Sequence, residues 1–212
     1  MIIRDFLSRQ KGRYLKHLRD EQVEGLRDYF SDSPSIITNN CLSGFLCQDL
    51  KLPYLSPTVG LYFFFPDYIE FLSDIKGNLA GGLQFVKDSK YPIGNDRIRK
   101  HKKSYPIAML NEKIEIHFLH YETEKDAESK WIRRSERINF ENLIILGTEL
   151  DLCSQTDIQD FNNLNFSKKH FFTRNEYNLA STIYIEKFKN NLKIGDPYQS
   201  GHVLYKHLAR NI

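Results

Sequence analysis

The stretch SIITNNCLSG, residues 35–44, decides the fold class of this chain. Its first four residues, Ser35 to Thr38, form a short run bounded by turn signals, which predicts a buried strand. Small and polar residues then replace the apolar ones abruptly between Asn39 and Gly44, as is typical of a loop that joins a strand to a helix. A strand that leads into a helix is the unit of which α/β folds are built.

The same alternation continues along the rest of the chain. We expect further strands at residues 61–65, 107–110, 114–119, 143–146 and 170–173. We expect helices at residues 4–30, 67–75, 124–138 and 157–164, and a last helix that ends at Leu208. Strands separated by helices of this length predict a three-layer α/β/α fold with a mainly parallel sheet. The polar, basic residues 87–105 show no period and predict an exposed loop or a mobile lid.

Length and composition predict one soluble domain with a short appendage. The 212 residues are 41% hydrophobic and 27% charged, which is close to globular averages. We divide them into a basic helical arm, residues 1–33, and a single α/β domain, residues 34–212. The net charge of +3 is too small to indicate a nucleic-acid partner. Three cysteines without a Cys-x-x-Cys pair argue against a disulfide framework and against structural zinc.

The basic arm bears on localisation. The charged residues among its first 19 are Arg4, Asp5, Arg9, Lys11, Arg13, Lys16 and Arg19, a set that suits either a solvated helix or peripheral contact with the anionic inner membrane. The start lacks the apolar core of a signal peptide, and the longest apolar stretch, residues 59–66, is too short to span a bilayer. We therefore expect a cytoplasmic protein.

The first polar cluster follows the strand at residues 35–38. Asn39 and Asn40 can orient a carbonyl or a sugar hydroxyl, and Gly44 lets a ligand approach the backbone. Cys41 could be a thiolate nucleophile if a base or a helix N-terminus activates it, or it could be a small buried side chain. With two asparagines beside it, the turn favours a binding role over covalent catalysis.

The second cluster is His117-Phe118-Leu119-His120-Tyr121. Residues three apart on a strand point to opposite faces, so His117 and His120 do not form a metal pair, and we expect no metal site. His120, at the strand end, is the candidate general base or ligand for a sugar or phosphate oxygen, whereas His117 is interpreted as an interior histidine.

Two further groups could bind a substrate. Glu149 and Asp151 follow a strand and could hold a cation that bridges a nucleotide diphosphate, or they could cap the next loop. Arg133 and Arg137 lie on one helix face and could clamp a phosphate or carboxylate, or they could pair with surface acids. The chain has no Walker-type loop, Gly-x-Gly-x-x-Gly or Gly-x-Ser-x-Gly, which argues against NTPases, classical dehydrogenases and α/β-hydrolases.

Four motifs in order resemble a bacterial family of unknown function whose members are commonly labelled exopolysaccharide biosynthesis proteins and sometimes acetyltransferases. They are NNC-x-x-G from Asn39, SPTV-x-L from Ser56, IHFLHY from Ile116 and KW-x-RR-x-x-RIN from Lys130, and the resemblance covers residues 35–175. It implies an α/β/α fold and a place in capsule, exopolysaccharide or lipopolysaccharide assembly. The turn at Cys41 is also similar to the Gly-Asn-Cys turn of capsule acetyltransferases that bind coenzyme A, although Asn39 stands in place of the glycine.

Together these observations predict a transferase that moves an acyl group from coenzyme A to a sugar hydroxyl. Its expected catalytic residues are Asn40, Cys41 and His120, and its expected substrate-binding residues are Asn39, Gly44, Ser56, Thr58, Tyr121, Arg133, Arg137 and Asp151. The expected substrates are a sugar or lipid-linked glycan and a donor, with no separate cofactor. A glycosyltransferase that uses a nucleotide sugar, or a non-catalytic glycan-binding protein with aromatic contacts such as Tyr62, are the alternatives.

Overall fold

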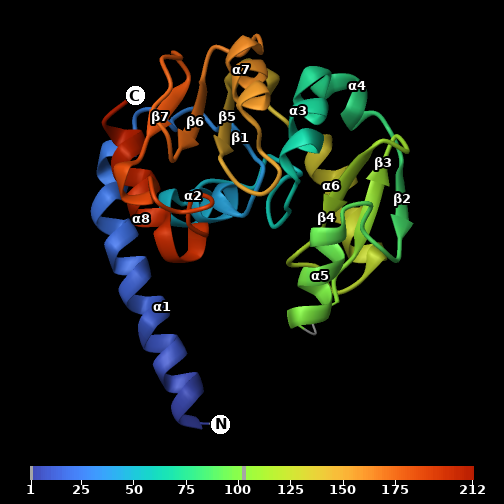
Figure 1. Cartoon of the computed structure of the whole chain (residues 1–212), viewed down its shortest axis with the longest axis horizontal. Coiled ribbons are helices and arrows are strands. Elements are labelled where there is room, and N and C mark those ends of the chain that lie inside the picture. Colours follow the sequence, from blue (N-terminus) through green and yellow to red (C-terminus); the bar gives the residue numbers. More distant parts are fainter. Residues whose placement is uncertain (1, 102–103) are drawn as a thin grey trace.

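A computed structural model describes the backbone of residues 2–101 and 104–212 and the side chains of residues 9–100 and 104–212 (Figure 1). The side chains of Arg4 and Asp5 in the predicted arm, and residues Lys102 and Lys103 of the predicted basic loop, lie outside this description.

A four-stranded parallel sheet forms the centre of the fold, which confirms the predicted α/β class. Its strands are β1 (Ser35–Thr38), β5 (Leu143–Thr148), β6 (Lys169–Thr173) and β7 (Thr182–Tyr184), in the order β1-β5-β6-β7. Every neighbouring pair is parallel, with Ile36 opposite Ile144 and Leu146 opposite His170. The sequence analysis missed β7, because a three-residue strand has too few positions to show a period.

Alternate strand residues face two different helical layers. Ile37, Ile145 and Phe171 belong to one buried cluster, with residues of α3 (Phe65–Ser73) and α7 (Gln155–Asn163). Ile36 and Ile144 belong to a second cluster, with residues of α2 (Leu42–Leu50) and α8 (Pro197–Ala209). The parallel sheet is therefore covered on both faces, which explains its continuous apolar strands.

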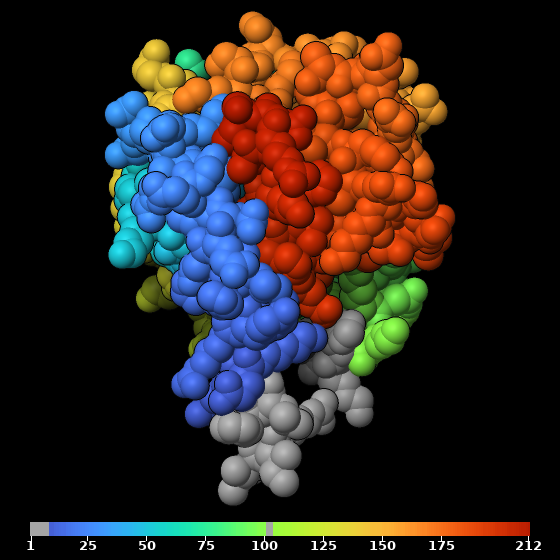
Figure 2. Space-filling view, turned by 90° about the vertical axis from the view of Figure 1, so that its left-hand side faces the viewer, coloured from blue at the N-terminus to red at the C-terminus, as the bar shows by residue number. Residues whose placement is uncertain are grey.

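The predicted N-terminal helix is present as α1 (Ile2–Val23), followed by the 3-10 helix η1 (Glu24–Leu26). It packs along α8, and Figure 2 shows the blue α1 segment and the red α8 segment side by side on this face. Val23, Leu26 and Phe30 are buried in the same cluster as α8. The C-terminal part of the arm therefore contributes to the core of the α/β fold.

A second, antiparallel sheet lies beside the first. It consists of β2 (Leu83–Val86), β3 (Ile107–Leu110) and β4 (Ile114–His117) in the order β2-β3-β4. The predicted strands at residues 107–110 and 114–119 are thus present, although the second ends earlier, and β2 was missed. In Figure 1 this sheet lies beside α4 (Ile75–Leu79), α5 (Pro92–His101) and α6 (Glu124–Ser135), and α3 contacts β4. The remaining 3-10 helices are η2 (Phe140–Asn142) and η3 (Glu186–Phe188).

Two predictions about local structure are wrong. Residues 61–65 form a single β-bridge, between Tyr62 and His117, because α3 already begins at Phe65. The stretch 87–105, predicted as a loop or lid, contains α5. This helix lacks an apolar stripe because its buried contacts are polar: the Asn95 side chain accepts a hydrogen bond from Ser89 N at 2.8 Å and donates one to Ser89 O at 2.8 Å.

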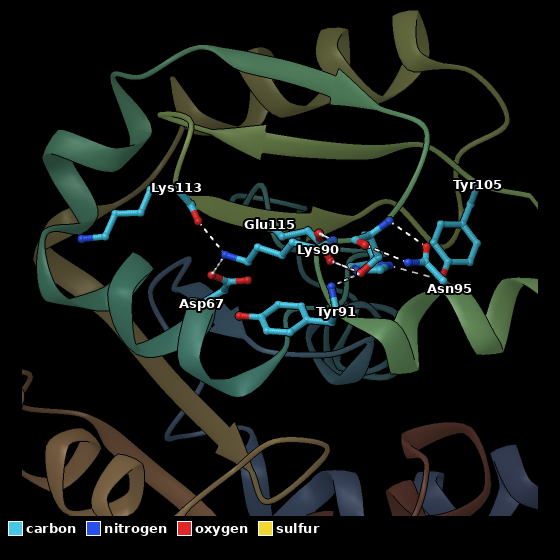
Figure 3. A network of polar contacts seen from close by, with 9 residues as sticks. Asp67, Lys90, Tyr91, Asn95, Tyr105, Lys113 and Glu115 are labelled. Atoms are coloured by element: carbon cyan, nitrogen blue, oxygen red, sulfur yellow. Dashed lines mark hydrogen bonds and ion pairs between the residues drawn. The ribbon is translucent and has the colours of Figure 1, made fainter.

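Buried polar contacts join α3 and the loop before α5 to the antiparallel sheet (Figure 3). Glu115, fully buried on β4, accepts hydrogen bonds from Ser89 Oγ at 2.5 Å and Lys90 N at 2.6 Å, and lies 2.6 Å from His117 Nε2. The Lys90 ammonium bonds Asp67 Oδ1 at 2.6 Å. His117 is thus confirmed as an interior histidine whose partners are internal.

Candidate functional site

A pocket of about 400 Å³ opens where residues that follow β1, β4 and β5 meet. Its walls comprise Asn40, Cys41, Phe45, Tyr62, Arg97, Leu119, His120, Leu150, Asp151, Lys193, Ile194, Asp196, Pro197 and Tyr198. The lining residues after β1 and β5 lie beyond the carboxyl ends of parallel strands, where α/β proteins place ligands. Two of the three polar clusters found in the sequence meet here at Cys41 and His120, and Asp151 comes from the third.

Cys41 and His120 are in direct contact. The distance between Cys41 Sγ and His120 Nε2 is 3.3 Å, although the two residues are 79 positions apart in the chain. Cys41 is the N-cap residue of α2, so its thiol lies at the end of the helix where the macrodipole favours negative charge. A thiol next to an imidazole at a helix N-terminus is an arrangement suited to nucleophilic catalysis.

Gly60 places His120 at this position. Its φ of +80° is in the left-handed region, and His120 N donates a hydrogen bond to Gly60 O at 3.3 Å. A Cβ on Gly60 would lie 3.3 Å from both His120 Cβ and Tyr121 Cε2. Glycine is therefore required here both for the backbone conformation and for the close approach of His120.

Tyr121 and Arg134 hold the backbone of Val59, the residue before Gly60, by hydrogen bonds. Tyr121 OH donates to Val59 O at 2.8 Å, and Arg134 Nη1 donates to Val59 O at 3.1 Å and to Tyr121 OH at 2.6 Å. Both side chains are buried and neither lines the pocket. The sequence analysis selected Arg133 and Arg137 on this helix; the helical spacing from Ala127 through Trp131 to Arg134 was the available signal for the buried arginine.

The polar residues around Cys41 mostly bond the protein itself. Asn39 donates to Thr148 O at 2.9 Å and accepts from Thr148 N at 3.1 Å, which joins the ends of β1 and β5. Asn40 Oδ1 accepts from Leu42 N at 2.9 Å, and the residue still lines the pocket. Thr58 Oγ1 accepts from Thr38 N at 3.2 Å. The Oγ of buried Ser56 lies 2.9 Å from Thr58 Oγ1. Asn39, Ser56 and Thr58 therefore hold the protein together and do not line the pocket, contrary to the prediction that they bind substrate.

A smaller pocket of about 240 Å³ shares Cys41, Phe45 and His120 with the larger one. It is lined by Cys41, Gly44, Phe45, Gln48, Tyr54, Val59, Gly60 and His120. Gly44 leaves room in it, since a Cβ there would meet Val59 Cγ1 only at 3.6 Å. The thiol and the imidazole are thus accessible from two pockets, which suits a reaction with two substrates.

Asp151 carries the charge network of the larger pocket. Its carboxylate accepts from Tyr62 OH at 2.9 Å and from the Lys193 ammonium, at 3.0 Å to each oxygen, and it pairs with Arg97. Burial alone would raise the pKa of Asp151, but hydrogen bonds from Arg97 and Lys193 outweigh it and hold that pKa below its ordinary value. Lys193 and Tyr198 had no signal in the sequence, whereas Arg97 was part of the basic stretch before residue 105.

The remaining charged candidates lie elsewhere. Glu149 pairs with Arg174 Nε at 2.9 Å, whereas Asp151 pairs with Lys193. The two carboxylates expected to share one cation therefore bind different basic side chains. Arg133 is exposed on α6, and Arg137 is exposed in the turn that follows it, where Arg137 donates to Tyr54 O at 3.1 Å and to Arg133 O at 3.1 Å. Within the described part of the chain, no group of three or more His, Cys, Asp or Glu side chains could hold a metal ion.

Fold and site together define an α/β protein with a thiol–imidazole pair beyond the carboxyl end of its parallel sheet. The chain belongs to the DUF1919 family, a domain of unknown function whose model matches residues 22–211. It is also 34% identical, over 166 residues, to an uncharacterized protein of Haemophilus influenzae, with 78% of this chain and 74% of that protein covered. None of the helices described is long and apolar enough to cross a membrane.

Proposed function

We propose that this chain is an acyltransferase of bacterial surface-polysaccharide synthesis that moves an acyl group from coenzyme A to a sugar hydroxyl by way of Cys41. The observation that carries the proposal is the 3.3 Å contact between Cys41 Sγ and His120 Nε2 on the wall of a pocket of about 400 Å³. This contact favours a covalent role for Cys41 over the binding role that the sequence favoured.

In the first half-reaction His120 Nε2 accepts the thiol proton, and the Cys41 sulfur attacks the carbonyl carbon of the acyl thioester. The bond between that carbon and the sulfur of coenzyme A breaks, and the released thiolate takes the proton back from His120. The acyl group is then bound to Cys41. One thioester replaces another, so no oxidant and no energy source is needed.

In the second half-reaction the sugar hydroxyl occupies the larger pocket next to His120. His120 takes the hydroxyl proton while the oxygen attacks the acyl carbon, and the bond from that carbon to Cys41 Sγ breaks. The proton returns to the sulfur, which restores the starting state. Cys41 and His120 line two pockets, which offers one to the donor and one to the acceptor.

The other two cysteines provide internal controls for Cys41. Burial raises the pKa of Cys47 to about 12. Burial, aided by the nearby Glu149 carboxylate, also raises the pKa of Cys153 above its ordinary range. Both therefore remain thiols at neutral pH, and thiols are poor nucleophiles.

The polysaccharide substrate is supported by two observations. The four sequence motifs resemble proteins labelled for exopolysaccharide synthesis. The larger pocket also contains the aromatic rings of Phe45, Tyr62 and Tyr198, with the rings of Phe45 and Tyr198 centred 6.3 Å apart. Aromatic faces next to polar side chains suit the mixed apolar and polar surface of a sugar.

Alkylation and mass spectrometry test the mechanism. We expect iodoacetamide to label Cys41 at least about tenfold faster than Cys153, and His120→Asn to remove that advantage. Acetyl-coenzyme A should add one acetyl group, located on Cys41 by peptide mapping. Cys41→Ser should lose the adduct with little change in melting temperature, whereas Cys153→Ala should keep it.

Two results would overturn the proposal. One is full acyl transfer by Cys41→Ala. The other is a rise in melting temperature with UDP- or CMP-sugars but none with coenzyme A or acetyl-coenzyme A, which would favour a glycosyltransferase. A ligand at one hundred times its dissociation constant stabilises a protein by about 2.7 kcal/mol, so the comparison is measurable.

A further inference from the structure

The larger pocket has a cationic side, formed by Arg97 and Lys193 with the Asp151 carboxylate behind them. The Asp151 side chain is only 11% exposed, whereas Arg97 is 29% and Lys193 is 45% exposed. A molecule that enters the pocket therefore meets the two cations before it meets the carboxylate.

The hydrogen-bonding capacity of this side points the same way. Asp151 already accepts bonds from Tyr62, Lys193 and Arg97, so little acceptor capacity remains for a ligand. A guanidinium has five N–H donors and an ammonium has three, and Asp151 cannot use all of them. The groups left for a ligand on this side are donors, and they carry positive charge.

Arg97 is held in place for this role by two rings. Its guanidinium carbon lies 5.2 Å from the centroid of Tyr62 and 5.5 Å from that of Phe64. Two cation–π contacts restrict the movement of the guanidinium, and its N–H groups that Asp151 does not use remain available for an oxyanion. The other carboxylate in the lining, Asp196, already accepts a bond from Tyr198 N at 2.7 Å as the cap of α8.

We infer that Arg97 and Lys193 bind a phosphate group of the sugar acceptor, so that the substrate is a sugar phosphate and not a neutral sugar. With the Asp151 carboxylate counted, this cluster carries a net charge of +1 and presents several free N–H donors, which suits a phosphate with its three acceptor oxygens. Cys41 and the two cations line one pocket, so a phosphate held by the cations lies in the same pocket as the reacting thiol. Only the assignment of the sugar phosphate as the acceptor rests on the proposed function.

Calorimetry on a Cys41→Ala background tests the inference without any turnover. The probes are glucose 1-phosphate, inorganic phosphate and glucose. We expect glucose 1-phosphate to bind at least about tenfold more tightly than glucose, and its affinity to fall with added salt. Lys193→Gln should weaken its binding about tenfold. Lys189→Gln, which removes an exposed lysine paired with Glu186, is the matched control and should leave binding unchanged.

Asp151→Asn distinguishes an anion site from a neutral-sugar site by the sign of its effect. If the cations bind phosphate, loss of their internal counter-ion should tighten glucose 1-phosphate binding. If Asp151 instead accepts a sugar hydroxyl, the same change should weaken the binding of glucose and glucose 1-phosphate alike.

Equal affinity for glucose and glucose 1-phosphate, or no effect of Lys193→Gln, would overturn the inference. Lys193 is exposed, so we expect Lys193→Gln to fold normally. This variant therefore still tests the inference if Asp151→Asn does not fold. If calorimetry shows phosphate-dependent binding but acetyl-coenzyme A leaves no acetyl group on Cys41 of the wild-type protein, this inference is upheld and the proposed acyl transfer is refuted.

Discussion

The buried ion pair between Arg19 and Asp49 should be the strongest single polar contact between α1 and the rest of the chain. Arg19 Nε lies 2.6 Å from Asp49 Oδ2, and the two side chains are 6% and 1% exposed. Tyr205 OH on α8 donates to the same oxygen at 3.1 Å. The Arg19 guanidinium also lies 4.7 Å from the centroid of Phe45, a residue that lines both pockets.

Arg19→Met removes the charge and keeps most of the aliphatic packing. The Asp49 carboxylate would then remain buried with the Tyr205 hydroxyl as a close donor and with Lys16 Nζ 3.8 Å away. Loss of one partner from a buried pair costs about 3–5 kcal/mol. For a chain of 212 residues this lowers the melting temperature by about 6–20 °C.

Urea unfolding at constant pH measures the effect, with two comparison variants. Lys16→Met removes an exposed cation from the same carboxylate and should cost less than about 1 kcal/mol. The double variant with Arg19→Met and Asp49→Leu should recover most of the loss, because an apolar pair can replace a buried ion pair at little net cost. A loss for Arg19→Met no larger than that for Lys16→Met would refute the reasoning.

Three other changes should alter stability in defined ways. Burial lowers the pKa of His170 below its ordinary 6.5, so the contribution of His170 to the free energy of unfolding is fully present above pH 6.5 and is lost as the pH drops below that value. His170→Gln, which can keep the bond to Tyr29, should therefore lose less stability than the wild type between about pH 7.5 and pH 5.5 in urea titrations. Gly147→Ala should cost about 1–3 kcal/mol in the same assay, because its Cβ would overlap the ring of Phe171; an unchanged midpoint would contradict this. Thr123→Ala should cost about 1 kcal/mol by removing the cap of α6, and Thr123→Ser should retain it.

The elements that could be predicted from the sequence are those with strong local signals. The run Ser35 to Thr38 and the cap at Thr123 involve neighbouring residues, and both were located correctly. The helix α5 was missed because its buried contacts, such as the close approach of Gly94 to Ser89, are not apolar and leave no period in the sequence. The strand β2 was missed because its residues are only half-buried or exposed, so their pattern is weak.

The candidate site was predictable in its parts and not in its assembly. Cys41 and His120 were each selected because they follow a strand, but nothing in the sequence indicated that they touch across two different sheets. Asn39 was selected for the same reason, and its amide instead joins β1 to β5. An asparagine after a strand can either bind a substrate or join two strands, and the choice depends on which strand lies beside it. Lys193 could not be found, because an exposed lysine in a loop has no local signature.

The distance between Cys41 and His120 is set by the irregular segment that follows Val59. Tyr62 forms backbone hydrogen bonds in both directions with His117 on β4, at 2.9 and 3.0 Å. Phe63 N donates to Asn39 O at 3.0 Å, at the end of β1. One short segment is thus bonded both to the strand that precedes His120 and to the residue that precedes the Asn40–Cys41 turn. A regular strand would continue to pair along one partner, whereas a single bridge lets the chain contact both sheets within two residues. The failure of the predicted strand at residues 61–65 and the meeting of the two catalytic candidates therefore have the same physical cause.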